Sequence, residues 1–167
     1  MSRLAEVGLA FADEAPLRLV LHAEIAATPD EVYGALSDDP SAWTWFPSLQ
    51  GGRFPAGTSA IGDPREVRIG GTTIAETILA ADPGRRWAYR VDAMQIPIAK
   101  ALIEVWDLAE VSATSTRPAA TRIVYTFALE PNRLSTRIAG PTGAVIATLF
   151  AKAARNLERV LAVPSMP

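Results

Sequence analysis

The sequence predicts an α+β fold: a curved antiparallel sheet of about seven strands wrapped around a long C-terminal helix, with two short helices after the first strand. Three observations predict it. Alternating apolar and polar stretches recur between turn residues, two helix-start signals follow the first of these stretches, and a helical amphipathic pattern closes the chain. The 167 residues, 49% of them hydrophobic, suit a single domain over residues 1–167. Residues 1–15 show no firm period, so we expect an N-terminal extension that is partly mobile or draped on the surface.

Two helix starts follow the first strand directly. Residues 17–25 alternate between apolar and polar positions, which predicts a half-buried strand. Residues 28–31 read Thr-Pro-Asp-Glu, a capping box with proline at the first helical position. Residues 38–40 repeat the start signal, so a second short helix should carry Trp43 and Phe46.

The middle of the chain reads as a series of strands joined by turns. A weak strand lies near the glycines at 51–57, and the Gly-Gly pair at 70–71 suits a tight hairpin turn. Further strands are expected at residues 66–69, 72–80, 86–91, 101–111 and 122–129. Such a sheet must bury one face, and the terminal helix is the element long enough to cover it.

The C-terminal helix carries its apolar residues at helical spacing. They are Ile146, Leu149, Phe150, Ala153, Leu157, Val160 and Leu161. We expect the face from Ile146 to Leu157 to pack against the concave side of the sheet. A strongly bent sheet closed by one helix tends to leave a space, which here would be an internal cavity.

Composition excludes several classes of site. Sixteen basic and eighteen acidic residues give a net charge of −2, which argues against binding nucleic acid. There is no cysteine, and the single histidine, His22, cannot form a metal-binding cluster, so we predict no cofactor and no tightly held transition metal. The longest strongly apolar helical piece, residues 143–151, is too short to span a bilayer. The N-terminus also lacks the long apolar stretch of a secretory signal, so we expect a cytoplasmic protein without a transmembrane segment.

Five stretches of the sequence carry a family resemblance: residues 28–33, 43–47, 64–71, 74–91 and 121–131. Through them, residues 17–162 resemble the START-like, or helix-grip, superfamily, and more narrowly its bacterial polyketide cyclase/dehydrase and lipid-transport (SRPBCC) branch. The resemblance implies the helix-grip fold and a deep apolar cavity that holds a lipid, a sterol, an aromatic polyketide or a similar ligand. Some members catalyse cyclisation or dehydration, and others bind or carry. The loop at residues 111–121 departs from the family because it lacks the usual glycine-rich turn.

Under that fold, the inward-facing side chains would line a ligand cavity or would simply fill the core. The candidate cavity residues are Trp43, Phe46, Glu76, Trp87, Tyr89, Val91, Tyr125, Phe127, Ile146, Leu149, Phe150 and Ala153. Three of these are candidates for acid or base catalysis: Glu76, Tyr89 and Tyr125. The alternative is that Glu76 forms a salt bridge to an arginine such as Arg65, Arg68 or Arg90, or is simply exposed.

Other polar residues are expected at the surface or stay open. Apolar residues occupy both sides of the strand at 101–111, so the sequence does not say whether Glu104 points inward. His22 lies opposite the leucine face of the first strand and is expected to be solvated, with no neighbour that completes a catalytic triad. The arginines are scattered over many strands, which indicates a solvated outer face of the sheet.

Three functions fit this sequence. The first is a protein that binds or carries a small hydrophobic ligand: a lipid, or an aromatic or polyketide-like molecule. The second is a metal-free cyclase or dehydratase acting on an aromatic or polyketide-like substrate. The third is an interaction module that modulates a partner protein, and a homodimer is also left open. One isolated polar atom in the cavity would favour a binding or carrier protein, and several titratable groups around one point would favour an enzyme. A filled pocket beside an exposed apolar patch would favour the interaction module.

Overall fold

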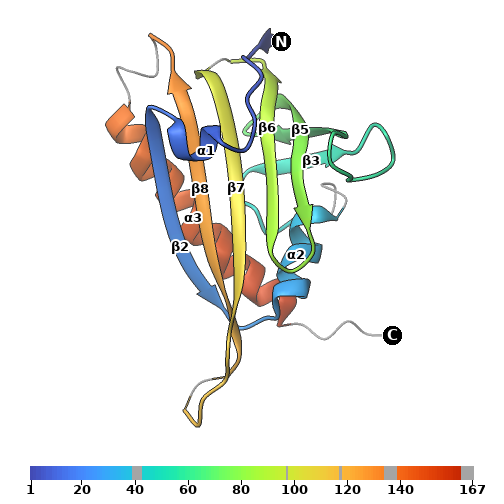
Figure 1. Ribbon diagram of the computed structural model, residues 1–167, viewed down its shortest axis with the longest axis vertical. Coiled ribbons are helices and arrows are strands. Elements are labelled where there is room, and N and C mark those ends of the chain that lie inside the picture. The colour runs from blue at the N-terminus through green and yellow to red at the C-terminus, as the bar shows by residue number, and fades with distance from the viewer. Residues whose placement is uncertain (39–42, 97, 117, 134–138, 163–167) are drawn as a thin grey trace.

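A strongly curved antiparallel sheet forms the body of the molecule (Figure 1). The computed structural model describes residues 1–38, 43–96, 98–116, 118–133 and 139–162. Its strands are β1 (Ser2–Arg3), β2 (Leu17–Ile25), β3 (Leu49–Arg53), β4 (Pro64–Ile69), β5 (Thr72–Asp82), β6 (Arg86–Met94), β7 (Ala99–Val111) and β8 (Ala120–Pro131). The sheet order is β2-β8-β7-β6-β5-β4-β3, and β1 pairs with β6 off this path. The α+β class and the antiparallel sheet expected from the sequence are confirmed.

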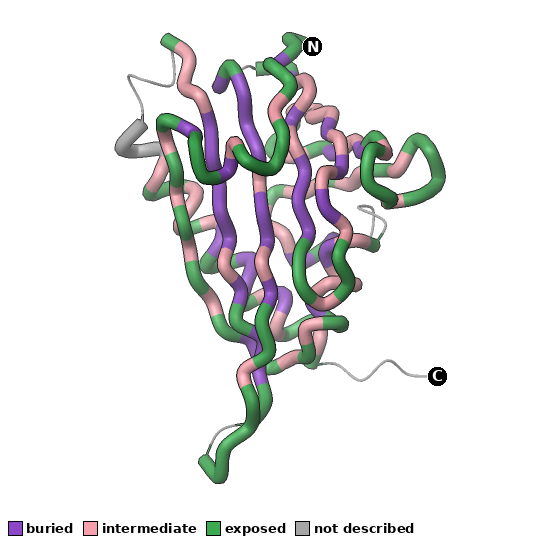
Figure 2. The backbone as a smooth tube through the Cα atoms, in the orientation of Figure 1, coloured by how far each residue is buried: buried purple, intermediate pink, exposed green. Residues whose placement is uncertain are grey.

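The strands keep the faces that their alternation predicts. Half-buried and exposed residues alternate along β2, where His22 is exposed as expected. In β6, Trp87, Tyr89 and Val91 belong to the main core on the concave side. Figure 2 shows that burial concentrates along the central strands of the sheet.

A capping box opens the helix that follows β2. Helix α2 (Pro29–Ser37) begins at Thr28, whose side chain accepts a hydrogen bond from the backbone N–H of Glu31 at 3.3 Å. In return the Glu31 carboxylate accepts from the backbone N–H of Thr28 at 2.8 Å. The second predicted short helix falls partly on residues 39–42, which lie outside the described residues. From residue 43 to residue 48 the chain runs in turns rather than in a helix.

The long helix α3 (Ala139–Leu161) covers the concave side of the sheet, as expected. Phe150, Ala153 and Leu157 are buried in the main core, and Leu157 is 1% exposed. Two polar contacts hold the C-terminal half of α3. The side-chain amide of Asn156 donates to the Trp45 carbonyl at 3.0 Å, and the carboxylate of Glu158 accepts from a backbone N–H after β2 at 2.9 Å.

The N-terminal extension is draped over the convex side of the sheet, which is one of the two alternatives the sequence left open. Strand β1 pairs with the end of β6, beyond the point where β6 and β7 stop pairing. Helix α1 (Phe11–Glu14) then lies against β7 and β8 (Figure 1). A second, smaller core forms under it from alanines and from Ile103 and Val105 of β7. Both faces of β7 are therefore buried, which explains why its apolar residues occupy both sides.

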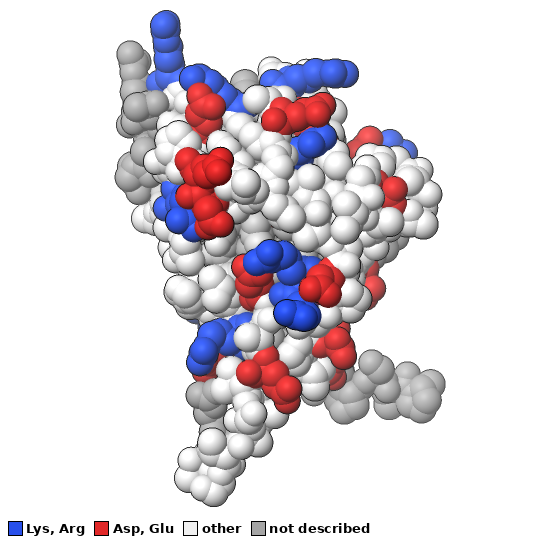
Figure 3. All heavy atoms as spheres, in the orientation of Figure 1, with Lys and Arg blue, Asp and Glu red and all other residues white. Residues whose placement is uncertain are grey.

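Charges of both signs are interspersed on the convex face shown in Figure 3. Several arginines there pair with carboxylates on neighbouring strands, such as Arg86 with Asp107 at 2.6 Å and Arg122 with Glu24 at 3.1 Å. For these residues the expected solvated outer face is what the structure shows.

Candidate functional site

Two adjoining chambers lie on the concave side of the sheet. The larger, here called the apolar chamber, has a volume of about 300 Å³ and lies between the sheet and α3. Its lining residues are Phe46, Ile69, Ile74, Val91, Met94, Ile98, Leu102, Glu104, Tyr125, Phe127, Val145, Ile146, Leu149 and Phe150. The polar groups in this lining are the carboxylate of Glu104 and the hydroxyl of Tyr125. The chamber reaches the surface beside Val145, which is 56% exposed.

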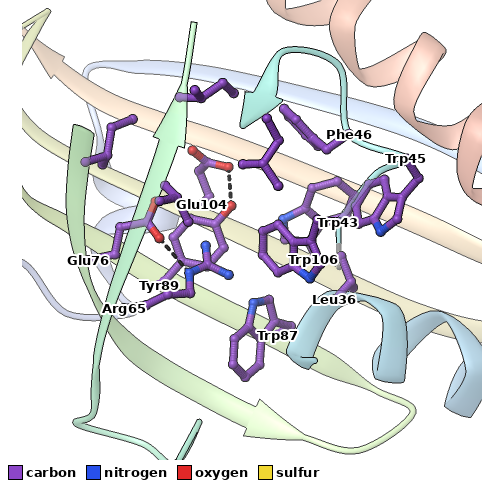
Figure 4. A pocket seen from close by; sticks show the side chains of 14 residues that line it. Leu36, Trp43, Trp45, Phe46, Arg65, Glu76, Trp87, Tyr89, Glu104 and Trp106 are labelled. Carbon is purple, nitrogen blue, oxygen red and sulfur yellow. Dashed lines mark hydrogen bonds and ion pairs between the residues drawn. The ribbon is translucent and has the colours of Figure 1, made fainter. Parts of the chain in front are cut away.

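The smaller space, here called the polar chamber, has a volume of about 60 Å³ and is drawn in Figure 4. It shares Phe46, Ile69, Ile74 and Glu104 with the apolar chamber. Its other lining residues are Leu36, Trp43, Trp45, Leu49, Arg65, Val67, Glu76, Trp87, Tyr89 and Trp106. A charged pair, a second carboxylate and several aromatic rings thus meet in a small space beside a large apolar one.

Arg65 and Glu76 form a buried ion pair at the wall of the polar chamber. They lie directly opposite each other on the neighbouring strands β4 and β5. The guanidinium Nε donates to the Glu76 carboxylate at 2.6 Å, and the two side chains are 1% and 4% exposed. A β-bulge between Ala75 and Glu76 lies at this point of β5. Two buried charges are tolerated because each partner compensates the other.

Aromatic rings surround the Arg65 guanidinium and supply further stabilisation. Its central carbon lies 3.9 Å from the ring centre of Tyr89 and 4.5 Å from that of Trp43. Trp87 lies at 5.8 Å. Such cation–π contacts are strongest when the cation is desolvated, as it is here. The guanidinium therefore stays charged inside an aromatic cage.

Glu104 lies where the two chambers meet. The hydroxyls of Tyr89 and Tyr125 both donate to its Oε2 atom, at 2.6 and 2.7 Å. The three residues come from the adjacent strands β6, β7 and β8, which explains their convergence. Glu104 retains some accessible surface although it lies deep in the fold, because it lines both chambers.

Burial shifts the protonation of these groups. It raises the pKa of Glu76 to about 7, against the opposing pull of Arg65. It also raises the pKa of Glu104, although the hydrogen bonds from Tyr89 and Tyr125 act in the other direction. Burial and the nearby Glu104 carboxylate raise the pKa of both tyrosines well above the usual range, so they remain neutral donors. The site therefore holds two carboxyl groups that are easier to protonate than ordinary ones.

Burial alone would lower the pKa of Arg65, but the contacts with Glu76 and Tyr89 outweigh it and raise that pKa. The positive charge of the polar chamber is thus permanent at physiological pH.

All but one of the predicted cavity residues line a chamber. Trp43, Phe46, Glu76, Trp87 and Tyr89 line the polar chamber, and Phe46, Val91, Tyr125, Phe127, Ile146, Leu149 and Phe150 line the apolar one. Ala153 is the exception. It is 1% exposed and packs in the main core, so it lines neither chamber.

Two residues of the site are absent from the predicted cavity set, although the sequence names both: Arg65 as a possible salt-bridge partner of Glu76, which the structure confirms, and Glu104 with its direction open. Arg65 was expected on a solvated outer face and is instead fully buried, so that expectation is wrong for this residue. Its alternation with Val67 and Ile69 on the same side of β4 was the available signal. The direction of Glu104 was left open. It shares the inward side of β7 with Leu102 and Trp106, which line the chambers as it does.

Comparison with known proteins establishes the family. The model of the family described as "Polyketide cyclase / dehydrase and lipid transport" matches residues 16–162, and the chain belongs to this family. The family and the helix-grip fold expected from the sequence are thus confirmed. No curated protein matches the chain.

Solved structures share the fold at low identity. Major latex-like protein 151 of Panax ginseng has a TM-score of 0.68 at 13% identity, covering 88% of this chain and 98% of its own. XoxI of Bacillus cereus has a TM-score of 0.68 at 14% identity, covering 86% of this chain and 94% of its own. A START superfamily protein of Mycobacterium smegmatis has a TM-score of 0.61 at 13% identity, covering 86% and 96%. At such identities the likeness concerns the fold alone.

Two features are absent from the described ranges. Among those residues, no three His, Asp or Glu side chains are grouped so that they could hold a metal ion. Within the same part of the chain, no helix combines the length and apolar character needed to cross a membrane.

Proposed function

We propose that this protein binds a small apolar ligand in the apolar chamber between the sheet and α3. The observation that carries the proposal is a space of about 300 Å³ whose lining is apolar except for Glu104 and Tyr125. Small-molecule sites are typically concave, mostly apolar and fitted with a few polar groups of this kind. Burying an apolar ligand there is favourable because its surface leaves water. The ligand class is a lipid or an aromatic or polyketide-like molecule.

A fluorescent titration tests this proposal. N-phenyl-1-naphthylamine, which is neutral and apolar, should bind with a stoichiometry near one. It should also quench tryptophan emission, because Trp106 contacts Tyr125 and Phe150 of the chamber lining. Leu149→Trp fills the chamber and should abolish binding while the protein stays folded. Thr148→Trp places the same side chain on an exposed position of α3 and is the matched control. Equal binding by Leu149→Trp and Thr148→Trp would refute an internal site.

Native mass spectrometry of the protein purified from its own host would then identify the ligand class. The natural ligand should appear as an added mass that Leu149→Trp lacks.

A second candidate function is catalysis by Glu104, and a specific observation favours it. Three titratable groups, Glu104, Tyr89 and Tyr125, converge at one point of the chamber wall. None of the described residues donates to the other oxygen of Glu104, Oε1, so it is available to accept a proton from a ligand. With a carbonyl substrate, the C–H bond next to the carbonyl breaks, its proton moves to Glu104, and an enolate forms. Cyclisation and dehydration both begin with steps of this kind.

Proton exchange tests the second candidate without knowledge of the natural substrate. In D₂O, the protein should accelerate the exchange of the methyl protons of 2-acetonaphthone for deuterium, and proton NMR measures the rate of this exchange. Glu104→Gln should bind the ketone but lose the acceleration. Exchange that is no faster than in buffer would argue for a binding protein alone. The interaction module is not favoured, because it required a filled pocket.

A further inference from the structure

Four N–H donors on residues that line the polar chamber are fully buried and have no hydrogen-bond partner within the part of the chain that the structure describes. They are the indole Nε1 atoms of Trp43, Trp87 and Trp106 and the Nη1 atom of Arg65. Buried polar groups in folded proteins nearly always have a partner, and each exception calls for an explanation. Figure 4 shows Arg65 reaching from β4 into the middle of the group formed by these indoles and Tyr89. Four unpaired donors around one small space indicate a site for a hydrogen-bond acceptor.

The charges around this space select a neutral acceptor. Facing the Arg65 guanidinium are Glu76 from β5, Tyr89 from β6 and Glu104 from β7. Asp92, also on β6, acts electrostatically on Glu76. A carboxylate ligand would bring a further negative charge to a chamber that already holds two carboxyl groups and one cation. An uncharged oxygen accepts hydrogen bonds from the same N–H donors without that repulsion.

The geometry also sets how a ligand lies. The polar chamber, at about 60 Å³, holds a functional group rather than a whole ligand, and the apolar chamber adjoins it across Phe46 and Glu104. A ligand body in the apolar chamber can therefore place one end among the unpaired donors.

We propose that the polar chamber binds the carbonyl oxygen at one end of a neutral ligand whose apolar body fills the apolar chamber. This inference rests on the proposed function and adds the chemical class of the ligand: an apolar ketone, aldehyde, ester or amide. The carbonyl oxygen has two lone pairs, so it accepts from two of the four donors at once. The Arg65 charge strengthens such a hydrogen bond, because hydrogen bonds from a charged donor are stronger than those between neutral groups.

Indole NMR tests the proposal directly. The chain has four tryptophans, and all of them line the polar chamber. 2-Acetonaphthone supplies the carbonyl, and 2-ethylnaphthalene has the same shape without it. The ketone should move at least one indole N–H resonance of Trp43, Trp87 or Trp106 downfield, and the hydrocarbon should not. Trp45, whose N–H is not among the unpaired donors, is the internal control. The ketone should also bind roughly tenfold more tightly in calorimetry.

A double variant, Arg65→Met with Glu76→Met, gives a second measurement. It removes both members of the ion pair and so avoids leaving one buried charge unpaired. It should keep the affinity for 2-ethylnaphthalene and lose most of the preference for the ketone. If the double variant fails to fold, the indole N–H shifts of the unchanged protein still test the proposal.

Each outcome of these measurements supports or overturns the proposal. Equal affinities for the ketone and the hydrocarbon, with unmoved indole resonances, would overturn it and leave the proposed function standing. Tighter binding of 2-naphthoate than of the ketone would overturn the choice of a neutral acceptor. If none of the three probes binds saturably, both the proposed function and this inference are wrong.

Discussion

The buried carboxyl of Glu76 should make the stability of the fold depend on pH in an unusual direction. Its pKa rises from the ordinary value of 4.5 to about 7 on folding, because burial disfavours the charged form. Between these two values the folded protein binds a proton that the unfolded chain has released. The free energy of unfolding therefore falls as pH rises. The contribution of Glu76 is fully present below about pH 4.5 and is lost above about pH 7.

The size of the effect follows from the same shift. Each pKa unit corresponds to about 1.4 kcal/mol, so a rise from 4.5 to about 7 amounts to about 3 kcal/mol between pH 5 and pH 8. Glu104, whose pKa is also raised by burial, adds in the same direction. Glu31, whose pKa is lowered by its hydrogen bonds to Thr28, acts below this window and with the opposite sign.

Urea unfolding at pH 5, 6, 7 and 8 measures this dependence. Glu76→Gln is the matched variant, because its amide keeps the shape and cannot ionise. The parent protein should lose stability across the series, and the variant should lose much less. A parent protein that gains stability between pH 5 and pH 8, or a variant with the same slope as the parent, would show that Glu76 does not cause the pH dependence.

Three further predictions concern the fold and its ligands. Leu157→Ala should reduce the free energy of unfolding by about 2–5 kcal/mol in urea titrations, because Leu157 is 1% exposed. Val160→Ala is the control and should cost far less, because Val160 is 47% exposed. Equal effects would contradict the assignment of Leu157 to the buried face of α3. Thr28→Ala removes one half of the capping box of α2 and should cost about 1 kcal/mol by the same assay, and an unchanged midpoint would speak against the cap. Elemental analysis after dialysis against a chelator should find no stoichiometric zinc or iron, since the chain has no cysteine and one histidine; either metal at one per chain would refute this.

The sequence pattern predicted the faces of the strands well, because alternation in a strand fixes the side on which each residue lies. Trp87, Tyr89 and Val91 could be assigned to the concave side from their spacing alone. The capping box at Thr28 likewise located the start of α2. Both features depend on neighbours within a few residues of the chain.

Contacts between strands could not be predicted in the same way. The sequence offers several arginines as partners of Glu76, and the choice of Arg65 depends on the register of β4 against β5. The convergence on Glu104 depends on three adjacent strands. The double burial of β7 arises because the N-terminal extension covers Ile103 and Val105 from the other side. Ala153 had the spacing of a cavity residue, but the way α3 packs on the sheet puts it in the core.

The position of a bound probe decides whether the ligand site is internal. With N-phenyl-1-naphthylamine bound, isotope-filtered NOE spectra report which methyl groups lie next to the probe. We predict contacts to Leu102, Ile146 and Leu149, which line the apolar chamber from β7 and α3. Contacts confined to exposed methyl groups such as those of Val20 or Ile61, at 41% and 67% exposure, would contradict an internal ligand site.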